Sequence, residues 1–311
     1  MVEDSGPFHQ GELAVQRATG ERATGAANGR IIADRLLPAA VGFIARQSLA
    51  VVASVDGDGR PWCSALVGPP DSFTAPDLGR VALDRAAGRP DDPLWDNVRR
   101  DPRAGVLFLE VGSRKRYRVN GRVADPDGDP LVVEVGEAFG NCHRYITRRR
   151  LAVGPAEPDG TAGGVATGVG LGDAERRIIA TADSAFVASA NAGGLLDASH
   201  RGGRPGFVEV RGEQLWIPDY PGNGMFMTLG NLRVHPPAGL LFVDFAASES
   251  LQLTGVSVLD LDAGDASDGA DSGGRTGGTG RAWTFTPTAW RRAPLPRRVQ
   301  ADQAELSPHN P

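Results

Sequence analysis

The residues best suited to chemistry lie in one short polar stretch. Ser199, His200 and Arg201 are consecutive, and Arg204 follows two glycines. Arginine can hold a phosphate through two parallel N–H bonds, while hydroxyl and glycine N–H groups bind the remaining oxygens. The stretch therefore predicts a phosphate receptor. The alternative is a solvated hairpin turn that is basic by composition, because Gly is common in such turns.

A second polar loop follows the next apolar run. Ile217-Pro218-Asp219 ends a predicted strand, and Pro221-Gly222-Asn223 forms a tight turn before a predicted helix. The first turn of a helix has unpaired N–H groups, so its N-terminus can receive an anion. Asp219 and Asn223 can equally be turn and cap residues that touch no ligand.

Other chemistries have little support in the sequence. Cys63 and Cys142 stand alone, without the spacing of a disulfide framework or a zinc site, and they fit a reducing compartment. Cys142 and His143 are neighbours, but adjacent side chains do not make a nucleophile–base pair by themselves. We expect this segment to be a linker helix in which Tyr145 packs, with His143 or Arg144 facing a cleft. No catalytic residue and no metal site is predicted.

The elements that must position these residues occur twice. The segment 97–108 matches 231–242 at an offset of 134 residues, and 117–121 matches 251–255 at the same offset. An upstream apolar run at 49–54 matches 184–189 with one residue of slippage. Three ordered blocks at an almost constant offset predict a duplicated module.

Each copy predicts a small barrel of five or six antiparallel strands with short helices. In copy one, the predicted helix 38–47 precedes strands at 49–54, 62–67, 80–83, 105–111 and 115–123. In copy two, the predicted helix 173–182 precedes strands at 184–189, 206–210, 214–217, 239–245 and 250–258, with a last strand near 283–285.

Copy two resembles the pyridoxamine 5′-phosphate oxidase-like superfamily of FMN-binding split β-barrels. The resemblance is carried by D-x-S-x-R-G-G-x-P-G-F-V at 197–208, and by the segments 215–223, 228–242 and 251–255. Copy one resembles the same fold more loosely. The fold expected is therefore mainly β, with two tandem split β-barrels that form a pseudo-dimer within one chain.

The resemblance implies FMN in the cleft between the barrels. Ser199, His200 and Arg201 would contact its phosphate or ribityl chain, and Ile217, Pro218 and Asp219 would offer backbone groups near the isoalloxazine edge. The other residues expected in this site are Gly222, Asn223, Thr228 and Gln252, the last reaching the ring from across the barrel.

The basic strand of copy one has two interpretations. Arg114, Lys115, Arg116 and Arg118 crowd it. The simpler interpretation, which we favour from sequence, is an exposed strand edge protected by charge. The alternative places Arg116 or Arg118 in the shared cleft, against the cofactor phosphate.

The expected domains are an N-terminal extension (1–37), barrel one with a degenerate site (38–150), a linker (151–171), barrel two with the cofactor site (172–290) and a C-terminal tail (291–311). A Gly-rich loop at 263–280 is expected to be flexible because it has too little apolar surface to order itself.

The function expected is a flavin oxidoreductase that transfers hydride between a reduced nicotinamide, NAD(P)H, and a small acceptor. The alternatives are a non-catalytic flavin or haem binding or storage protein, and a reductase that uses the deazaflavin F420. A net charge of −5 without a basic stripe argues against nucleic acid, and no apolar run is long enough to span a membrane. We expect a cytoplasmic protein, in which chains can pair further as a homodimer.

Overall fold

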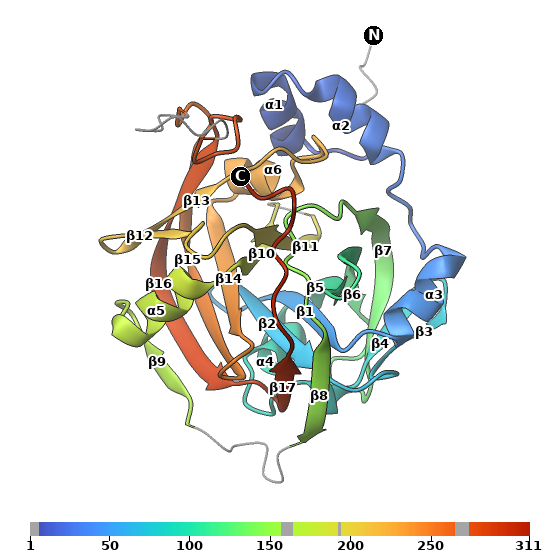
Figure 1. Cartoon of the computed structure of the whole chain (residues 1–311). Coiled ribbons are helices and arrows are strands. Elements are labelled where there is room, and N and C mark those ends of the chain that lie inside the picture. The colour runs from blue at the N-terminus through green and yellow to red at the C-terminus, as the bar shows by residue number, and fades with distance from the viewer. Residues whose placement is uncertain (1–5, 157–163, 192–193, 265–273) are drawn as a thin grey trace.

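Two large antiparallel sheets, one from each half of the chain, form the body of the molecule (Figure 1). The computed structural model describes residues 6–156, 164–191, 194–264 and 274–311. The first sheet has the order β2-β1-β5-β6-β7-β4-β3. Its strands are β1 (Leu49–Val55), β2 (Pro61–Val67), β3 (Phe73–Asp77), β4 (Arg80–Leu83), β5 (Arg103–Glu110), β6 (Lys115–Val123) and β7 (Leu131–Asn141).

The second sheet repeats this order as β11-β10-β14-β15-β16-β13-β12. Its strands are β10 (Ser184–Ala190), β11 (Leu196–Gly202), β12 (Glu209–Arg211), β13 (Gln214–Pro218), β14 (Pro237–Asp244), β15 (Glu249–Asp260) and β16 (Ala282–Pro294). Each strand of one sheet has a counterpart at the same place in the other. The mainly β class and the two tandem units are therefore confirmed.

Short helices occupy matching positions in the two halves. The helices α3 (Pro38–Ala45) and α5 (Asp173–Thr181) precede β1 and β10, and α4 (Leu94–Arg100) and α6 (Met227–Val234) precede β5 and β14. A 3-10 turn, η1 (Arg85–Ala87), follows β4. No helix in the described ranges is long and apolar enough to cross a membrane.

Each barrel has a hydrophobic core of its own, and a further core lies between the two barrels. Along β1, Ala50 and Val52 point into barrel one, while Leu49 and Val51 point into a core shared with Phe186 of β10. A third core fills barrel two. Side chains alternate along a strand, so both faces of β1 are buried, which explains its unbroken apolar run.

Two glycines at equivalent positions show that the barrels pack about a pseudo-two-fold axis. A Cβ at Gly105 of β5 would lie 2.5 Å from the carbonyl oxygen of Leu196 in β11. A Cβ at Gly239 of β14 would lie 2.7 Å from the carbonyl oxygen of Pro61 in β2. Each barrel therefore presents the same pair of strands to the other, as in an isologous dimer interface.

The segments outside the predicted barrels contain helices and strands of their own. The N-terminal segment forms α1 (Gln10–Ala18) and α2 (Arg22–Gly29), and α1 packs on α6. The predicted linker contains β8 (Leu151–Ala156) and β9 (Ala166–Gly168), while the predicted tail contains β17 (Arg297–Ala301). β8 pairs with β17 and β9 pairs with β16, as Figure 1 shows for the first pair.

The end of barrel two and one of its strands also differ from the prediction. β16 continues to Pro294, past the expected end at 290. In the Gly-rich loop at 263–280, residues 265–273 lie outside the described residues. The second strand of barrel two was predicted at 206–210, but the segment 196–202 forms the strand that pairs with β10. Only 209–210 of the predicted range belong to a strand, β12. Tertiary pairing with an apolar neighbour outweighs the weak strand propensity of Asp, Ser and Gly in that segment.

Candidate functional site

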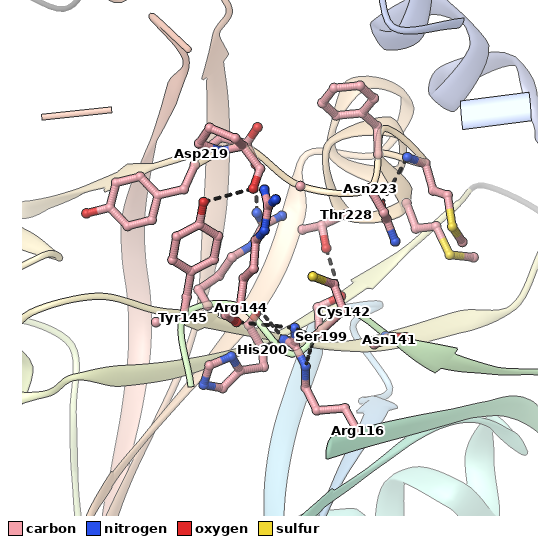
Figure 2. Close-up of a pocket in the computed structure, with 18 of the residues that line it drawn as sticks. Arg116, Asn141, Cys142, Arg144, Tyr145, Ser199, His200, Asp219, Asn223 and Thr228 are labelled. Carbon is pink, nitrogen blue, oxygen red and sulfur yellow. Dashed lines mark hydrogen bonds and ion pairs between the residues drawn. The ribbon is translucent and has the colours of Figure 1, made fainter. Parts of the chain in front are cut away.

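A pocket lies where β6 and β7 of barrel one face β11 and α6 of barrel two (Figure 2). The turn after β7 and the loop between β13 and α6 complete its walls. Arg116, Arg118, Arg144 and Arg201 line it, and Asp219 is the carboxylate among its lining residues. The lining therefore carries an excess of positive charge, which favours an anionic ligand.

The strand β11 explains how the Ser-His-Arg cluster is presented. Leu196 and Ala198 belong to the core between the barrels, so Ser199 and Arg201 lie on the opposite face of the strand. His200 lies on the core side, with its ring 5.5 Å from that of Phe186. The three consecutive side chains therefore do not act as a single loop receptor.

A corner of hydroxyl and guanidinium groups forms around Ser199. Arg118 donates to Ser199 Oγ at 2.7 Å, and Thr228 Oγ1 lies 2.9 Å from the same oxygen. Arg118 also donates to Asp197 at 3.1 Å. The Arg118 side chain is buried, yet its Nε has no hydrogen-bond partner. A buried donor without a partner is costly, so this corner is suited to an acceptor supplied by a ligand.

The imidazole of His200 is held neutral beside a second arginine. Arg116 Nη1 lies 3.1 Å from His200 Nδ1, and Ser184 Oγ lies 3.3 Å from Nε2. Burial lowers the pKa of His200 well below its usual value, and the charges of Arg116 and Arg201 lower it further. Burial also lowers the pKa of Arg116 to about 10, which leaves Arg116 cationic at neutral pH.

The carboxylate of Asp219 is bound by two arginines. Arg201 donates to its Oδ1 at 2.7 Å and Arg281 to its Oδ2 at 3.0 Å. Arg281 also pairs with Glu21 of the N-terminal segment at 2.7 Å. Asp219 is thus a poor candidate for a general base, whereas Arg201 keeps a buried Nε without a partner.

Aromatic side chains form the rest of the wall. The rings of Tyr145 and Tyr220 lie 5.2 Å apart, and Tyr145 Oη donates to the Pro221 carbonyl at 2.9 Å. Tyr145 and Phe226 have φ values of 65° and 59°, in the left-handed region that non-glycine residues rarely adopt. Such strain concentrates at ligand-binding sites, and flat aromatic walls suit a planar ring.

Comparison with protein families gives one match, to pyridoxamine 5′-phosphate oxidase over residues 36–152. These residues belong to the pyridoxamine 5′-phosphate oxidase-like family. The match covers barrel one, whereas the sequence motifs were clearest in barrel two. The common strand order of the two sheets extends the same fold to barrel two.

Comparison with curated proteins finds no match. Among solved structures, HupZ from Group A Streptococcus is 15% identical, with a TM-score of 0.27, and the alignment covers 34% of this chain and 94% of HupZ. A pyridoxinephosphate oxidase family protein from Clostridium acetobutylicum is 14% identical, with coverages of 40% and 89% and a TM-score of 0.28. HutZ, a haem storage protein from Vibrio cholerae, is 13% identical, with coverages of 42% and 89% and a TM-score of 0.22.

Most of the residues predicted for a cofactor site line this one pocket. They are Ser199, His200, Arg201, Pro218, Asp219, Gly222, Asn223 and Thr228. Ile217 does not line it, because its side chain is buried in the core of barrel two. The placement of Gln252 was wrong. It lies on the outward face of β15 and contacts Cys63 and Ser64 of barrel one, away from the pocket.

The favoured interpretation of the basic strand was also wrong. β6 lies between β5 and β7, and its outward face is covered by barrel two. Tyr117 and Val119 point into barrel one, so Arg116 and Arg118 point into the pocket. The alternation of basic and apolar residues along this strand was the signal that could have identified them.

The segment after β7 is a turn, not the predicted linker helix. Asn141, Cys142, Arg144 and Tyr145 line the pocket. His143 is exposed, and its ring lies 5.4 Å from that of His309. Arg144 therefore fulfils the expectation of a cleft residue, and His143 does not.

Proposed function

We propose that the chain binds FMN in the pocket between the barrels and acts as a flavin oxidoreductase. The observation that carries the proposal is the corner formed by Arg118, Ser199 and Thr228. It combines two hydroxyl groups with a buried guanidinium whose Nε is unpaired. Charge-assisted bonds of this kind are among the strongest that a protein offers to a phosphate.

The residues present fit the two chemical parts of FMN. Arg118, Ser199 and Thr228 would hold the phosphate, with Arg116 and Arg201 adding positive charge. The aromatic wall of Tyr145 and Phe226 would pack against the flavin ring. When bound, the flavin supplies the hydride chemistry, and the chain's own residues bind, orient and shield it.

The hydride donor and the acceptor are further parts of the proposal. A reduced nicotinamide, NAD(P)H, is the proposed hydride donor and a small molecule the acceptor. No general acid or base is assigned among the described residues, because both ring nitrogens of His200 contact other side chains and Asp219 is paired with two arginines. Cytoplasmic location and further pairing of chains into a homodimer stay predictions.

Haem storage is the less favoured alternative. Haem iron needs a protein ligand such as an unprotonated imidazole nitrogen. His200 is the histidine among the lining residues, and both of its nitrogens contact other side chains. A haem iron bound to His200 would have to displace Arg116 or Ser184. Phosphate binding at the corner of Arg118, Ser199 and Thr228, called the phosphate corner below, needs no such change.

Binding of FMN and riboflavin, compared by fluorescence titration, tests the proposal. The two ligands differ in the phosphate alone, so FMN should bind at least about 100-fold more tightly if charged groups hold the phosphate. Equal affinity for both ligands would show that the site does not bind the phosphate group. Titrations with F420 and with haemin, run in parallel, decide between the cofactors.

The enzymatic part of the proposal needs its own measurement. The FMN-loaded protein should oxidise NADH or NADPH faster than free FMN does, with bleaching of the flavin absorbance under anaerobic conditions. Tight FMN binding without bleaching by either nucleotide would identify a flavin-binding protein that uses another donor or none.

A further inference from the structure

A buried polar network links the phosphate corner to the N-terminal helix. Arg118 donates to Asp197 Oδ1 at 3.1 Å, and Asn231 donates to Asp197 Oδ2 at 3.0 Å. His9 Nε2 lies 2.9 Å from Asn231 Oδ1. Glu12 completes the chain, because its Oε2 accepts from the His9 backbone N–H at 2.8 Å. Three separate parts of the sequence therefore meet behind Arg118.

This network contains more carboxylates than cations. Asp197 and Glu12 are 3% and 2% exposed, and Glu137 of β7 joins them through Asn120, which donates to Asp197 at 2.6 Å and to Glu137 at 3.2 Å. Arg118 is the arginine that faces all three. Like charges buried together disfavour ionisation of every member, so one carboxyl should keep its proton.

The charge of Glu12 has the fewest hydrogen-bond donors around it. Asp197 accepts hydrogen bonds from Arg118, Asn120 and Asn231, whereas Glu12 accepts one from the His9 backbone N–H. Its side chain lies against the backbone of Gly230, where a Cβ would come within 2.4 Å of Glu12 Cγ. The pKa of Glu12 is raised to about 8, mainly because the carboxyl is buried. The charges of Asp197 and Glu137 also raise it, while the His9 backbone N–H and the charge of Arg118 oppose the shift.

We propose that Glu12 is the positioning residue that holds a proton for the phosphate corner, so that binding of a phosphate-bearing ligand at Arg118 is favoured while Glu12 is neutral. This inference rests on the proposed function. An anion at Arg118 adds negative charge to a region that already holds Asp197. An ionised Glu12 would oppose that anion, and a neutral Glu12 would not.

The charged groups around Glu12 determine how the affinity for FMN should change with pH. They are His9 on its own helix, Arg118 and Glu137 from barrel one, and Asp197 from barrel two. As the pH rises through about 8, Glu12 loses its proton, and the affinity for FMN should fall. The phosphate of FMN is a dianion over this range, because its second pKa is about 6.

The experiment measures FMN affinity from pH 6.8 to 9.5 for the full chain and for Glu12→Gln. In the wild type, affinity should fall by roughly three- to tenfold, as expected for one new charge near a partly screened site. The isosteric Glu12→Gln chain cannot ionise at this position and should show little change. The affinity for riboflavin, measured over the same pH range, shows any change that comes from ionisation of the flavin ring.

A matched variant controls for the loss of a buried helix-capping carboxylate. Glu175 lies at the corresponding third position of α5, is 4% exposed and binds the Gly172 N–H, but its carboxylate pairs with Arg292. Glu175→Gln should keep the wild-type pH profile. Calorimetry in two buffers with different ionisation enthalpies should show proton uptake on FMN binding at pH 8 in the wild type, and none in Glu12→Gln.

The outcomes separate the two proposals. Phosphate-dependent FMN binding with the same pH profile in the wild type and in Glu12→Gln overturns the role of Glu12 alone. A flat wild-type profile with tight FMN binding does the same. No preference for FMN over riboflavin at any pH overturns both this inference and the proposed function.

Discussion

The pocket at β6 and β11 has a counterpart at β15 and β2, which we call the closed site because its polar groups pair with one another. Ser64 lies opposite Val52 as Ser199 lies opposite Val187. Gln252 lies opposite Leu241 as Arg118 lies opposite Leu107. The duplication therefore places the Ser64–Gln252 pair where the other interface has Ser199 and Arg118.

The closed site satisfies its polar groups internally. Gln252 Nε2 donates to the Cys63 carbonyl and to Ser64 Oγ, both at 3.0 Å, and Ser64 Oγ donates to Asp92 at 2.6 Å. Arg291 completes the network by donating to Gln252 Oε1 at 3.2 Å and to Asp91 at 2.8 Å. No member of this network is left as a buried donor or acceptor without a partner in the described part of the chain.

The open site leaves the Nε atoms of Arg118 and Arg201 unpaired although they are buried. The comparison shows that two interfaces of the same fold can differ in whether their buried polar groups are paired. A neutral Gln with three acceptors in reach satisfies one interface, whereas an Arg with an unpaired donor makes the other suited to an anion. Stoichiometry should accordingly be one FMN per chain.

The largest expected effect comes from making the open site like the closed one. Arg118→Gln replaces the guanidinium by the residue found at the equivalent position, and FMN affinity should fall by about 100-fold or more because a charged phosphate contact is lost. Fluorescence titration measures the change. Gln252→Leu is the matched control, and its affinity should equal that of the wild type. A loss in both variants would mean that the two interfaces do not differ in function.

The two serines should separate binding from stability. Ser199→Ala removes a hydroxyl from the phosphate corner and should weaken FMN binding by about tenfold. Ser64→Ala should leave the affinity unchanged and lower the free energy of unfolding by about 1–3 kcal/mol, because Asp92 and Gln252 each lose a buried partner. Denaturant unfolding and titration of both variants test this crossed pattern, and equal effects of the two substitutions on affinity would contradict it.

The smallest effect concerns the pH dependence of stability at the closed site. Burial raises the pKa of Asp92 above its ordinary value of 3.8, although Ser64 and Gln252 favour its ionised form. The folded state therefore binds the proton more tightly than the unfolded state, so stability falls as the pH rises above about 3.8 toward the pKa of the folded state. Asp92→Asn should remove this part of the decline in unfolding free energy. An unchanged slope would show that Asp92 is ionised when folded.

Much of the fold was predictable because the duplication doubled the signal. The strand expected at 115–123 is β6, and the helix expected at 38–47 is α3 with slightly different ends. The strand β11 was missed because its polar residues are typical of a turn. Its pairing with β10 depends on a neighbour whose place in the sheet is not encoded locally.

The candidate site, too, was predictable in part from the sequence and in part only from the tertiary structure. The sequence alone determined that copy two carries a hydroxyl and arginine cluster, and that the segment from Asp219 to Thr228 forms a polar loop and helix start. Only the tertiary structure decided that Arg118, rather than Gln252, faces Ser199. Strand alternation tells which residues leave the barrel interior, but the packing of one barrel on the other decides what those residues meet.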